Sequence, residues 1–500
     1  MRFPRSCGTL VHPTSFPGKY GIGDFGYEAR MFLDFLEDTQ QSIWQVLPLT
    51  PTGYGNSPYA SYSAFAGNPY LISPDILFEK GLLTASEVRS LIIPSTTTVA
   101  YQQVVKKKSM ALKLASNSFY ETLVGDEVEK FELFKLEHAH WLDDYVLFMA
   151  VAKSHQMRPW NSWDSDIATH KKEAINKAKK NYAQEIKLEY WLQYEFLNQW
   201  IALKEYANTR GIRIIGDIPI FVDHNSADVW ANSKYFAVDK QGNRTLVSGV
   251  PPDYFSDTGQ LWGNPQYQWG ALEKDGYSWW VKRFKHMFLT CDAIRVDHFR
   301  GFDAYWEIPA SEKTAVNGRW VEGPGEKFFD TILKECGELP IIAEDLGFVT
   351  ERVEKLRDKY AFPGMKILQF AFDAESDNSF LPHNYPQNCV VYSGTHDNDT
   401  SKGWYEQAPE YEQHFARTYS QSDGTHINWA FIRLGMLSVG DQAIFPLQDF
   451  MSLSTEHRMN FPGTSSGNWL WRYTTEMLQE IDRNKICNLI HLSNRHDRNK

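Results

Sequence analysis

The sequence has no apolar run long enough to cross a membrane. A transmembrane helix needs about 20 consecutive apolar residues, and no stretch of the 500 residues approaches that length. The N-terminal segment MRFPRSCGTLVHPTSFPG also lacks the apolar core of a secretory signal. We therefore expect neither a membrane-spanning protein nor a secreted one.

Concentrated positive charge is also lacking. The formal net charge is −11, and the longest basic run is the three lysines at 106–108. Such a chain binds a phosphate backbone poorly, which disfavours nucleic acid as a partner.

The cysteines are few and form no CxxC pair. Their number is odd and their spacing wide, which argues against a disulfide framework or a zinc ribbon and favours a reducing compartment. We expect the cytoplasm, or the plastid stroma if a transit peptide has been removed. The five residues are Cys7, Cys291, Cys336, Cys389 and Cys487.

Aromatic residues, in contrast, are abundant. They make up 15% of the chain, with 17 Trp and 25 Tyr, and several lie in loops rich in Gly, Pro and Asn. Flat rings in loops can stack on the apolar faces of a ligand. Sugars offer such faces, and so do protein partners, so composition alone does not choose between them.

Short apolar runs alternate with helical patterns along the chain, which predicts βα units and a parallel sheet. Seven visible strands suggest a closed eight-stranded (β/α)8 TIM barrel with one unit missed, and an open doubly wound sheet is the alternative. The candidate strands span 43–49, 212–217, 292–297, 340–345, 366–372, 389–397 and 442–447. The candidate helices span 26–37, 185–209, 278–289, 326–336, 350–360, 427–437 and 471–482.

The spacing of these units predicts one barrel domain over residues 1–500 with two insertions. Residues 73–184 have helical patterns and a Lys-rich passage, typical of a mostly helical insertion subdomain. Residues 223–276 form a long connection rich in Gly, Pro, Asp and Trp. Connections of that length inside a compact domain are usually functional.

Acidic residues end several of the predicted strands. The acids are Asp217, Asp297, Glu344 with Asp345, and Asp397. In a parallel barrel the active site lies at the carboxyl ends of the strands. An acid after a buried strand can instead cap the next helix. Four strand ends of seven are less easily explained by capping.

The segment IRVDHFRG suggests a specific chemistry. Arg295 and Asp297 lie on the same side of a strand, so the guanidinium would keep the carboxylate ionised, as a nucleophile requires. Glu344 follows three apolar residues, which should raise its pKa and suit it to donate a proton. Such a pair is typical of a retaining glycosidase, although a structural ion pair remains possible. Asp397 could contact sugar hydroxyls and keep Glu344 protonated by like-charge repulsion.

Two other motifs are weaker. GIGDFG at 21–26 matches a dinucleotide-binding pattern but follows a loop, not a strand. His224, His298 and His396 lie near acids, but no metal-binding spacing is present, so we expect no metal site.

Together the motifs resemble a family, the 4-α-glucanotransferases called amylomaltase or disproportionating enzyme, glycoside hydrolase family seventy-seven of the α-amylase clan. The resemblance spans nearly the whole chain and implies a TIM barrel with helical insertions and no C-terminal β-domain. The matching segments occur in the family's order: LVHPTSFPGKYGIGDFG, WQVLPLTPTGYGNSPYASYSAFAGNPYLI, GDIPIFV, VSGVPPDYFSDTGQLWGNPQY, IRVDHFRG, IIAEDLG, SGTHDNDT and RMNFPGTSSGNW.

The resemblance also implies residue roles. Asp297 matches the nucleophile, Glu344 the acid/base and Asp397 the transition-state stabiliser. Pro251 to Gly259 match a loop over the cleft, and Tyr54 matches one aromatic of a second, remote glucan groove. The implied substrate-binding residues are Ser57, Tyr59, Asp217, Tyr254, Trp262, Arg295, Phe370, His396 and Asn468.

The implied reaction moves an α-1,4-glucan segment from a donor to the 4-hydroxyl of an acceptor glucan or glucose and needs no cofactor. Cycloglucan formation is a side activity implied by resemblance alone. The alternatives are an α-amylase-like retaining hydrolase and a non-catalytic glucan-binding protein. The expected partners are α-1,4-glucans and maltooligosaccharides, with the chain a monomer or homodimer.

Overall fold

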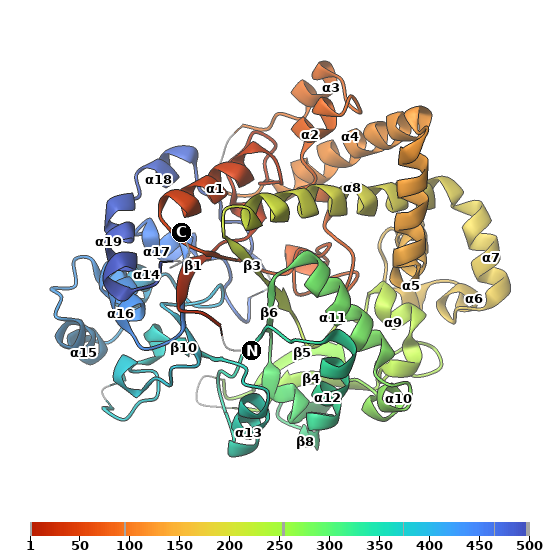
Figure 1. The fold of residues 1–500 in the computed structure, drawn as a ribbon. Helices are drawn as coiled ribbons and strands as arrows, with labels where there is room; N and C mark the ends of the chain where they lie inside the picture. The colour runs from red at the N-terminus through yellow and green to blue at the C-terminus, as the bar shows by residue number, and fades with distance from the viewer. Residues whose placement is uncertain (1–2, 95–96, 253–255, 374, 465, 497–500) are drawn as a thin grey trace.

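Eight parallel strands form the centre of the molecule, in a computed structural model that describes residues 3–94, 97–252, 256–373, 375–464 and 466–496, without the side chain of Tyr54. Each strand pairs with the next in chain order, and β12 with β1, except that β9 and β10 form the two ends of the sheet; this arrangement confirms the TIM barrel (Figure 1). The open doubly wound sheet is excluded. The strands are β1 (Ser6–Leu10), β2 (Ile43–Gln45), β3 (Arg213–Ile218), β6 (Ala293–Val296), β9 (Ile341–Ala343), β10 (Gly364–Ile367), β11 (Cys389–Tyr392) and β12 (Gln442–Pro446).

The missed strand is β1. Its sequence, SCGTL, contains little hydrophobic signal, yet all five residues are buried. Gly8 explains part of this, because a Cβ there would lie 2.0 Å from the carbonyl oxygen of Ile43. The close approach of β1 to β2 therefore requires glycine. The predicted strand at 366–372 is also corrected, since β10 ends at Ile367 and a 3-10 turn, Leu368–Phe370, follows.

The barrel closes between β9 and β10. The Ala343 N–H donates to the Pro363 carbonyl at 2.9 Å, and the Asp345 carboxylate accepts the Met365 N–H at 2.8 Å. The same carboxylate pairs with Arg357 at 2.6 Å. Arg357 lies on α13 (Glu351–Lys359). Asp345 therefore ties the last pair of strands together.

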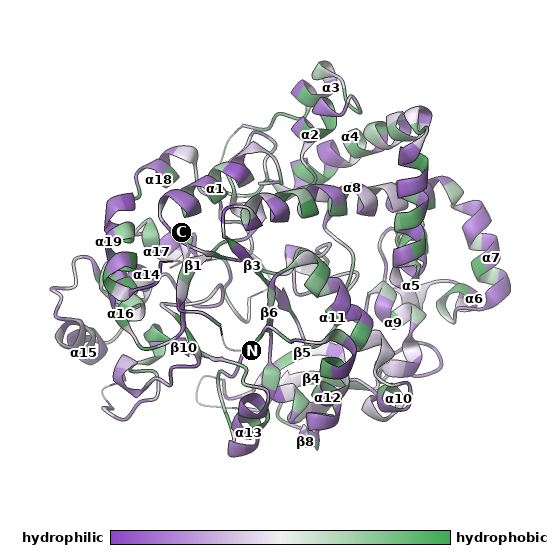
Figure 2. Cartoon of the chain, in the orientation of Figure 1, coloured by the Kyte–Doolittle hydropathy of each residue, from purple (hydrophilic) through white to green (hydrophobic). Residues whose placement is uncertain are grey.

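Most predicted helices are confirmed. The one predicted at 471–482 is wrong: α18 (Thr475–Gln479) ends first, and Asp482 caps the separate α19 (Arg483–Ser493) by accepting the Lys485 N–H. Figure 2 shows polar and apolar residues alternating along the helices, as expected of elements that cover a core on one side. The confirmed helices are α1 (Tyr27–Asp38), α8 (Ala183–Asn208), α11 (Ser278–Thr290), α12 (Gly325–Cys336), α13 and α16 (Ile427–Leu437).

The segment between β2 and α8 is helical and projects to one side of the barrel (Figure 1). A buried ion pair links it to the barrel: Lys108 on α4 contacts Asp24, in the GIGDFG segment, at 3.1 Å. That segment thus has a structural contact and no nucleotide-binding context. The helices are α2 (Pro74–Glu79), α3 (Ala85–Ser90), α4 (Tyr101–Thr122), α5 (Asp126–Ser154), α6 (Ser165–Ala168) and α7 (Lys172–Asn181).

A second sheet, which the sequence did not reveal, lies beside the barrel. Its four antiparallel strands have the order β5-β4-β7-β8. Two come from the long connection at 223–276, which also contains α9 (Ala227–Ala231) and α10 (Trp269–Lys274). The strands are β4 (Leu246–Val250), β5 (Gln260–Pro265), β7 (Ala304–Pro309) and β8 (Arg319–Glu322). No helix of the described residues is long and apolar enough to span a bilayer.

Asp345 offers a test of barrel closure. Asp345→Ala leaves the Met365 N–H without its acceptor and Arg357 without one partner. We expect the free energy of unfolding to fall by about 2–4 kcal/mol, measured by urea denaturation. Asp345→Asn keeps an acceptor oxygen and should lose less. An Ala variant as stable as the parent would show that closure does not depend on this carboxylate.

Candidate active site

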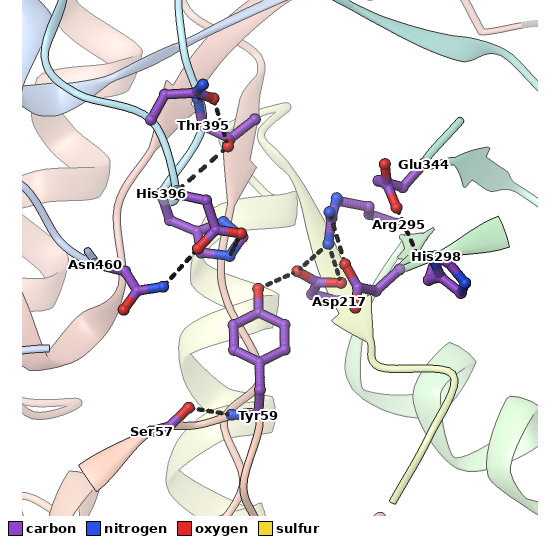
Figure 3. A network of polar contacts seen from close by, with 12 residues as sticks. Ser57, Tyr59, Asp217, Arg295, His298, Glu344, Thr395, His396 and Asn460 are labelled. Atoms are coloured by element: carbon purple, nitrogen blue, oxygen red, sulfur yellow. Dashed lines mark hydrogen bonds and ion pairs between the residues drawn. The ribbon is translucent and has the colours of Figure 1, made fainter. Parts of the chain in front are cut away.

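Asp217 and Arg295 form a buried ion pair at the carboxyl ends of β3 and β6. They stand opposite each other in the register of the two strands, and Arg295 Nη1 contacts both oxygens of Asp217, at 2.9 and 2.8 Å. The Tyr59 hydroxyl donates to the same carboxylate at 2.7 Å. The structure thus brings three predicted residues into one network (Figure 3).

Asp297 shares the guanidinium of Arg295. Arg295 Nη2 lies 2.9 Å from Asp297 Oδ1, while Nη1 is taken up by Asp217. Burial raises the pKa of Asp297, and the charges of Asp217 and Asp397 add to this, whereas Arg295 and His396 lower it. The expected pairing of Arg295 with Asp297 is therefore present, but one cation serves two carboxylates.

Glu344 follows β9 directly and is held by two backbone groups. The His298 N–H donates to Oε2 at 2.7 Å, and the Leu346 N–H donates to Oε1 at 2.9 Å. His298 has a left-handed backbone, with φ of 50°. Burial raises the pKa of Glu344 to about 7; the charge of Asp297 acts in the same direction, and Arg295 opposes it. The three apolar residues before Glu344 therefore predicted the direction of its pKa shift correctly.

Asp397 lies after β11 and is strongly hydrogen-bonded. His396 Nε2 is 3.2 Å from Oδ2, and the Asn460 amide donates to Oδ1 at 2.6 Å. Burial raises the pKa of Asp397, but these two partners outweigh it and hold the pKa well below its usual range. One expectation changes: the like charge acting on Glu344 is that of Asp297, and Asp397 acts on Asp297 instead.

Aromatic rings line the network beside Asp397. The Tyr59 ring stacks on the His396 ring at 5.1 Å and 10°, and Trp469 lies 5.7 Å from Tyr59. Ser57 contacts this wall indirectly, because its hydroxyl accepts the backbone N–H of Tyr59 at 3.2 Å.

The other predicted residues lie farther from the acids. Trp262 on β5 is 39% exposed and meets the His298 ring edge-on at 4.8 Å. Phe370 is equally exposed and packs on Phe380. The Asn468 amide bonds within its own loop, to Phe461 and Thr464. Among the described residues, no hydrogen bond or ring contact joins Phe370 or Asn468 to the three acids.

Two predicted positions lie outside what the structure describes. Tyr254 falls within residues 253–255, and the side chain of Tyr54 is likewise not described.

Sequence reasoning missed two residues that hold Asp397. Asn460 contacts its carboxylate, and Arg458 donates to its main-chain carbonyl at 2.9 Å and to the Asn460 carbonyl at 3.2 Å. Both belong to RMNFPGTSSGNW, from which only Asn468 was selected. The pairing of a basic and an amide residue in a loop was the available signal. In the described ranges, no three His, Cys, Asp or Glu side chains form a group suited to a metal ion.

The comparisons with known proteins show the family of this chain. A family model described as 4-alpha-glucanotransferase matches residues 11–478. The chain belongs to this family. The 4-alpha-glucanotransferase of Thermus thermophilus is 49% identical over 480 residues, which are 94% of this chain and 95% of that protein. The chloroplastic/amyloplastic 4-alpha-glucanotransferase of Arabidopsis thaliana is 43% identical, covering 94% of this chain and 81% of that one.

A solved structure is also similar to this chain. An amylomaltase from Streptococcus agalactiae, in complex with acarbose, has a TM-score of 0.96 and 37% identity, covering 99% of this chain and 100% of that one. The resemblance to the 4-α-glucanotransferases is therefore confirmed, both in sequence and in fold.

The two carboxyl groups predict a bell-shaped pH profile for the glucanotransferase. Above about pH 7 Glu344 loses its proton, so kcat/KM for maltotriose should fall as pH rises through that value. On the acid side Asp297 must stay ionised, and its raised pKa places that limb above the ordinary range of an aspartate. Initial rates of glucose release across pH check this. A rate that stays level well above neutrality would exclude Glu344 as the proton donor.

Proposed function

We propose that this 4-α-glucanotransferase works by retaining double displacement, with Asp297 as nucleophile, Glu344 as acid/base and Asp397 as transition-state stabiliser. The observation that carries the proposal is the different surroundings of two carboxyl groups at the ends of neighbouring strands. Asp297 is paired with Arg295, while burial raises the pKa of Glu344 to about 7. One carboxyl can attack while the other donates a proton.

The strand pairing supports the retaining geometry. Asp297 and Glu344 follow β6 and β9, which are neighbours, and the Glu344 N–H donates to the Val296 carbonyl at 3.0 Å. Adjacent strands lie about 4.8 Å apart. Carboxyl groups at their ends suit the about 5–5.5 Å separation of retaining enzymes.

The reaction then has two steps. Asp297 attacks the anomeric carbon while Glu344 protonates the departing glycosidic oxygen, which leaves a covalent glucosyl-enzyme. Glu344, now a base, takes the proton of an acceptor 4-hydroxyl, which attacks the same carbon and releases Asp297. Asp397, ionised and held by His396 and Asn460, would bind sugar hydroxyls as the ring distorts. One α-1,4 bond replaces another, so the exchange is near isoenergetic.

Transfer requires that an acceptor sugar outcompete water. We propose that exposed rings such as Trp262 and Phe370, with Tyr254 in the loop at 251–259, stack on sugars and exclude water. Ser57, Tyr59, Asp217, Arg295, His396 and Asn468 complete the proposed substrate-binding set, and Tyr54 the second groove. The family assignment disfavours the hydrolase, and the intact acids disfavour a purely binding role.

The remaining proposals concern the partners, the oligomeric form, the compartment and the domain organisation of the chain. We propose α-1,4-glucans and maltooligosaccharides as partners and a monomer or homodimer as the working form. The free cysteines fit a reducing compartment, the cytoplasm or the plastid stroma. We further propose residues 1–500 as one barrel domain with insertions at 73–184 and 223–276.

Maltotriose distinguishes transfer from hydrolysis. The purified protein should release glucose together with maltodextrins longer than the substrate, because the donor segment passes to another sugar. Chromatography of the products measures this. Reducing ends that rise steadily without longer products would identify a hydrolase instead.

Asp297→Asn tests the nucleophile. The amide keeps the shape of the side chain but cannot attack, so kcat should fall by several orders of magnitude, about 10³ or more, while maltooligosaccharide binding persists. Asp166→Asn, at an exposed acid on α6, is the matched control and should keep full activity. A loss of less than about tenfold would overturn the assignment.

A further inference from the structure

Two exposed rings and a buried arginine form a cluster that the proposed mechanism does not use. Phe348 is 73% exposed and Trp320 is 40% exposed, whereas Arg300 is only 7% exposed. We call Arg300, Trp320 and Phe348 the outer platform. A single exposed apolar residue is common and needs no explanation, but two exposed rings that share one arginine make a surface on which a ligand can stack.

Arg300 fixes the orientation of both rings. Its guanidinium lies 4.0 Å from the centre of the Trp320 ring and 5.6 Å from that of Phe348. Its Nη1 also donates to the Phe348 carbonyl at 2.5 Å. Trp306 supports Trp320 from behind at 5.2 Å. Trp320 is therefore held between Arg300 and Trp306 before any ligand arrives, and Arg300 anchors the main chain of Phe348, which lowers the entropy lost on binding.

The same arginine has an unused donor. Arg300 Nε is buried and has no hydrogen-bond partner among the described residues. A buried donor without an acceptor is unfavourable, and a ligand hydroxyl would satisfy it only if the side chain moved to expose this atom.

The platform is continuous with the active site. Arg300 lies in the 3-10 turn Phe299–Phe302, three residues beyond Asp297, and the Phe299 N–H donates to the Glu344 carbonyl at 3.0 Å. Phe348 lies four residues beyond Glu344, a reach of at most about 14 Å. Arg352 on α13 pairs with Asp303 and Glu322, which joins all three segments.

The proposed reaction indicates on which side of the cleft the acceptor sugars bind. The acid/base protonates the glycosidic oxygen of the leaving sugar, so the leaving group and the incoming acceptor occupy the side of Glu344. The outer platform continues from the Glu344 loop. We propose that Arg300, Trp320 and Phe348 form an outer acceptor subsite for an α-1,4-glucan chain, an assignment that rests on the proposed function.

A glucan fits this surface better than a protein does. The two exposed rings are separated by a guanidinium and flanked by Arg319 and Glu322, whose side chains are 74% and 79% exposed. A continuous apolar patch, typical of protein docking, is absent from these described residues. Flat faces beside hydrogen-bonding groups match the alternating C–H faces and hydroxyls of a sugar chain.

The test compares acceptors of different length. With α-maltotriosyl fluoride blocked at its 4-hydroxyl as donor, Phe348→Ala should raise KM for maltoheptaose about three- to tenfold. KM for glucose, which cannot reach the platform, and kcat for both should stay the same. Phe348→Leu keeps apolar surface without a flat ring and should show the same loss, whereas Phe348→Trp should restore KM. Tyr411→Ala, at a 56% exposed ring on α15 (Glu410–Ser420), is the matched control.

Failure of the outer subsite and failure of the proposed function give different results. An unchanged KM for maltoheptaose, an equal change for glucose, or full function of Phe348→Leu would each overturn the subsite. Titration of maltoheptaose into Asp297→Asn, with and without Phe348→Ala, measures binding without turnover. A parent chain that makes no longer products from maltotriose would remove the proposed function. A platform that still binds maltoheptaose in that titration would survive as a glucan site.

Discussion

The active site depends on one guanidinium shared by two carboxylates. Arg295 touches Asp217 and Asp297 at once, from β6, which lies between β3, the strand of Asp217, and β9, the strand that precedes Glu344. Four acids crowded at one barrel end repel one another, and burial adds to the cost of their charges. Arg295 offsets part of this cost for Asp297 and Asp217, while His396 and Asn460 do so for Asp397. For Glu344, burial outweighs Arg295 and two backbone N–H groups and raises the pKa to about 7, so this group holds a proton near neutrality.

Much of the fold follows from local patterns. Seven strands are continuous apolar runs, so their type and order were readable, and the closed barrel followed from them. Strand β1 could not be recognised from the sequence, because Ser6, Gly8 and Thr9 are not hydrophobic and are buried by the strands and helices around them. The second sheet was not predicted either, because its strands β4 and β5 are short and each contains a glycine, and β5 ends in a proline.

The site shows the same division. Acids after buried strands indicated the candidate catalytic carboxyl groups, since a buried carboxyl is costly without a partner or a function. The pattern could not separate Asp345, which closes the barrel, from Glu344 beside it, because only the partner on α13 distinguishes them. Nor could it find Asn460 and Arg458, whose contacts with Asp397 join segments 61 and 63 residues apart.

Because β6 and β9 are neighbouring strands, the stereochemical outcome of the reaction and the selectivity for chain length depend on different parts of the molecule. In the proposed mechanism, the stereochemical outcome depends on two hydrogen-bonded barrel strands, whose spacing tolerates little change. In the proposed acceptor subsite, chain-length selectivity depends on loops and on the second sheet at the rim of the barrel, where insertions and ring exchanges leave the barrel strands unchanged. Remodelling of this rim can therefore yield enzymes with new glucan preferences that all preserve the anomeric configuration.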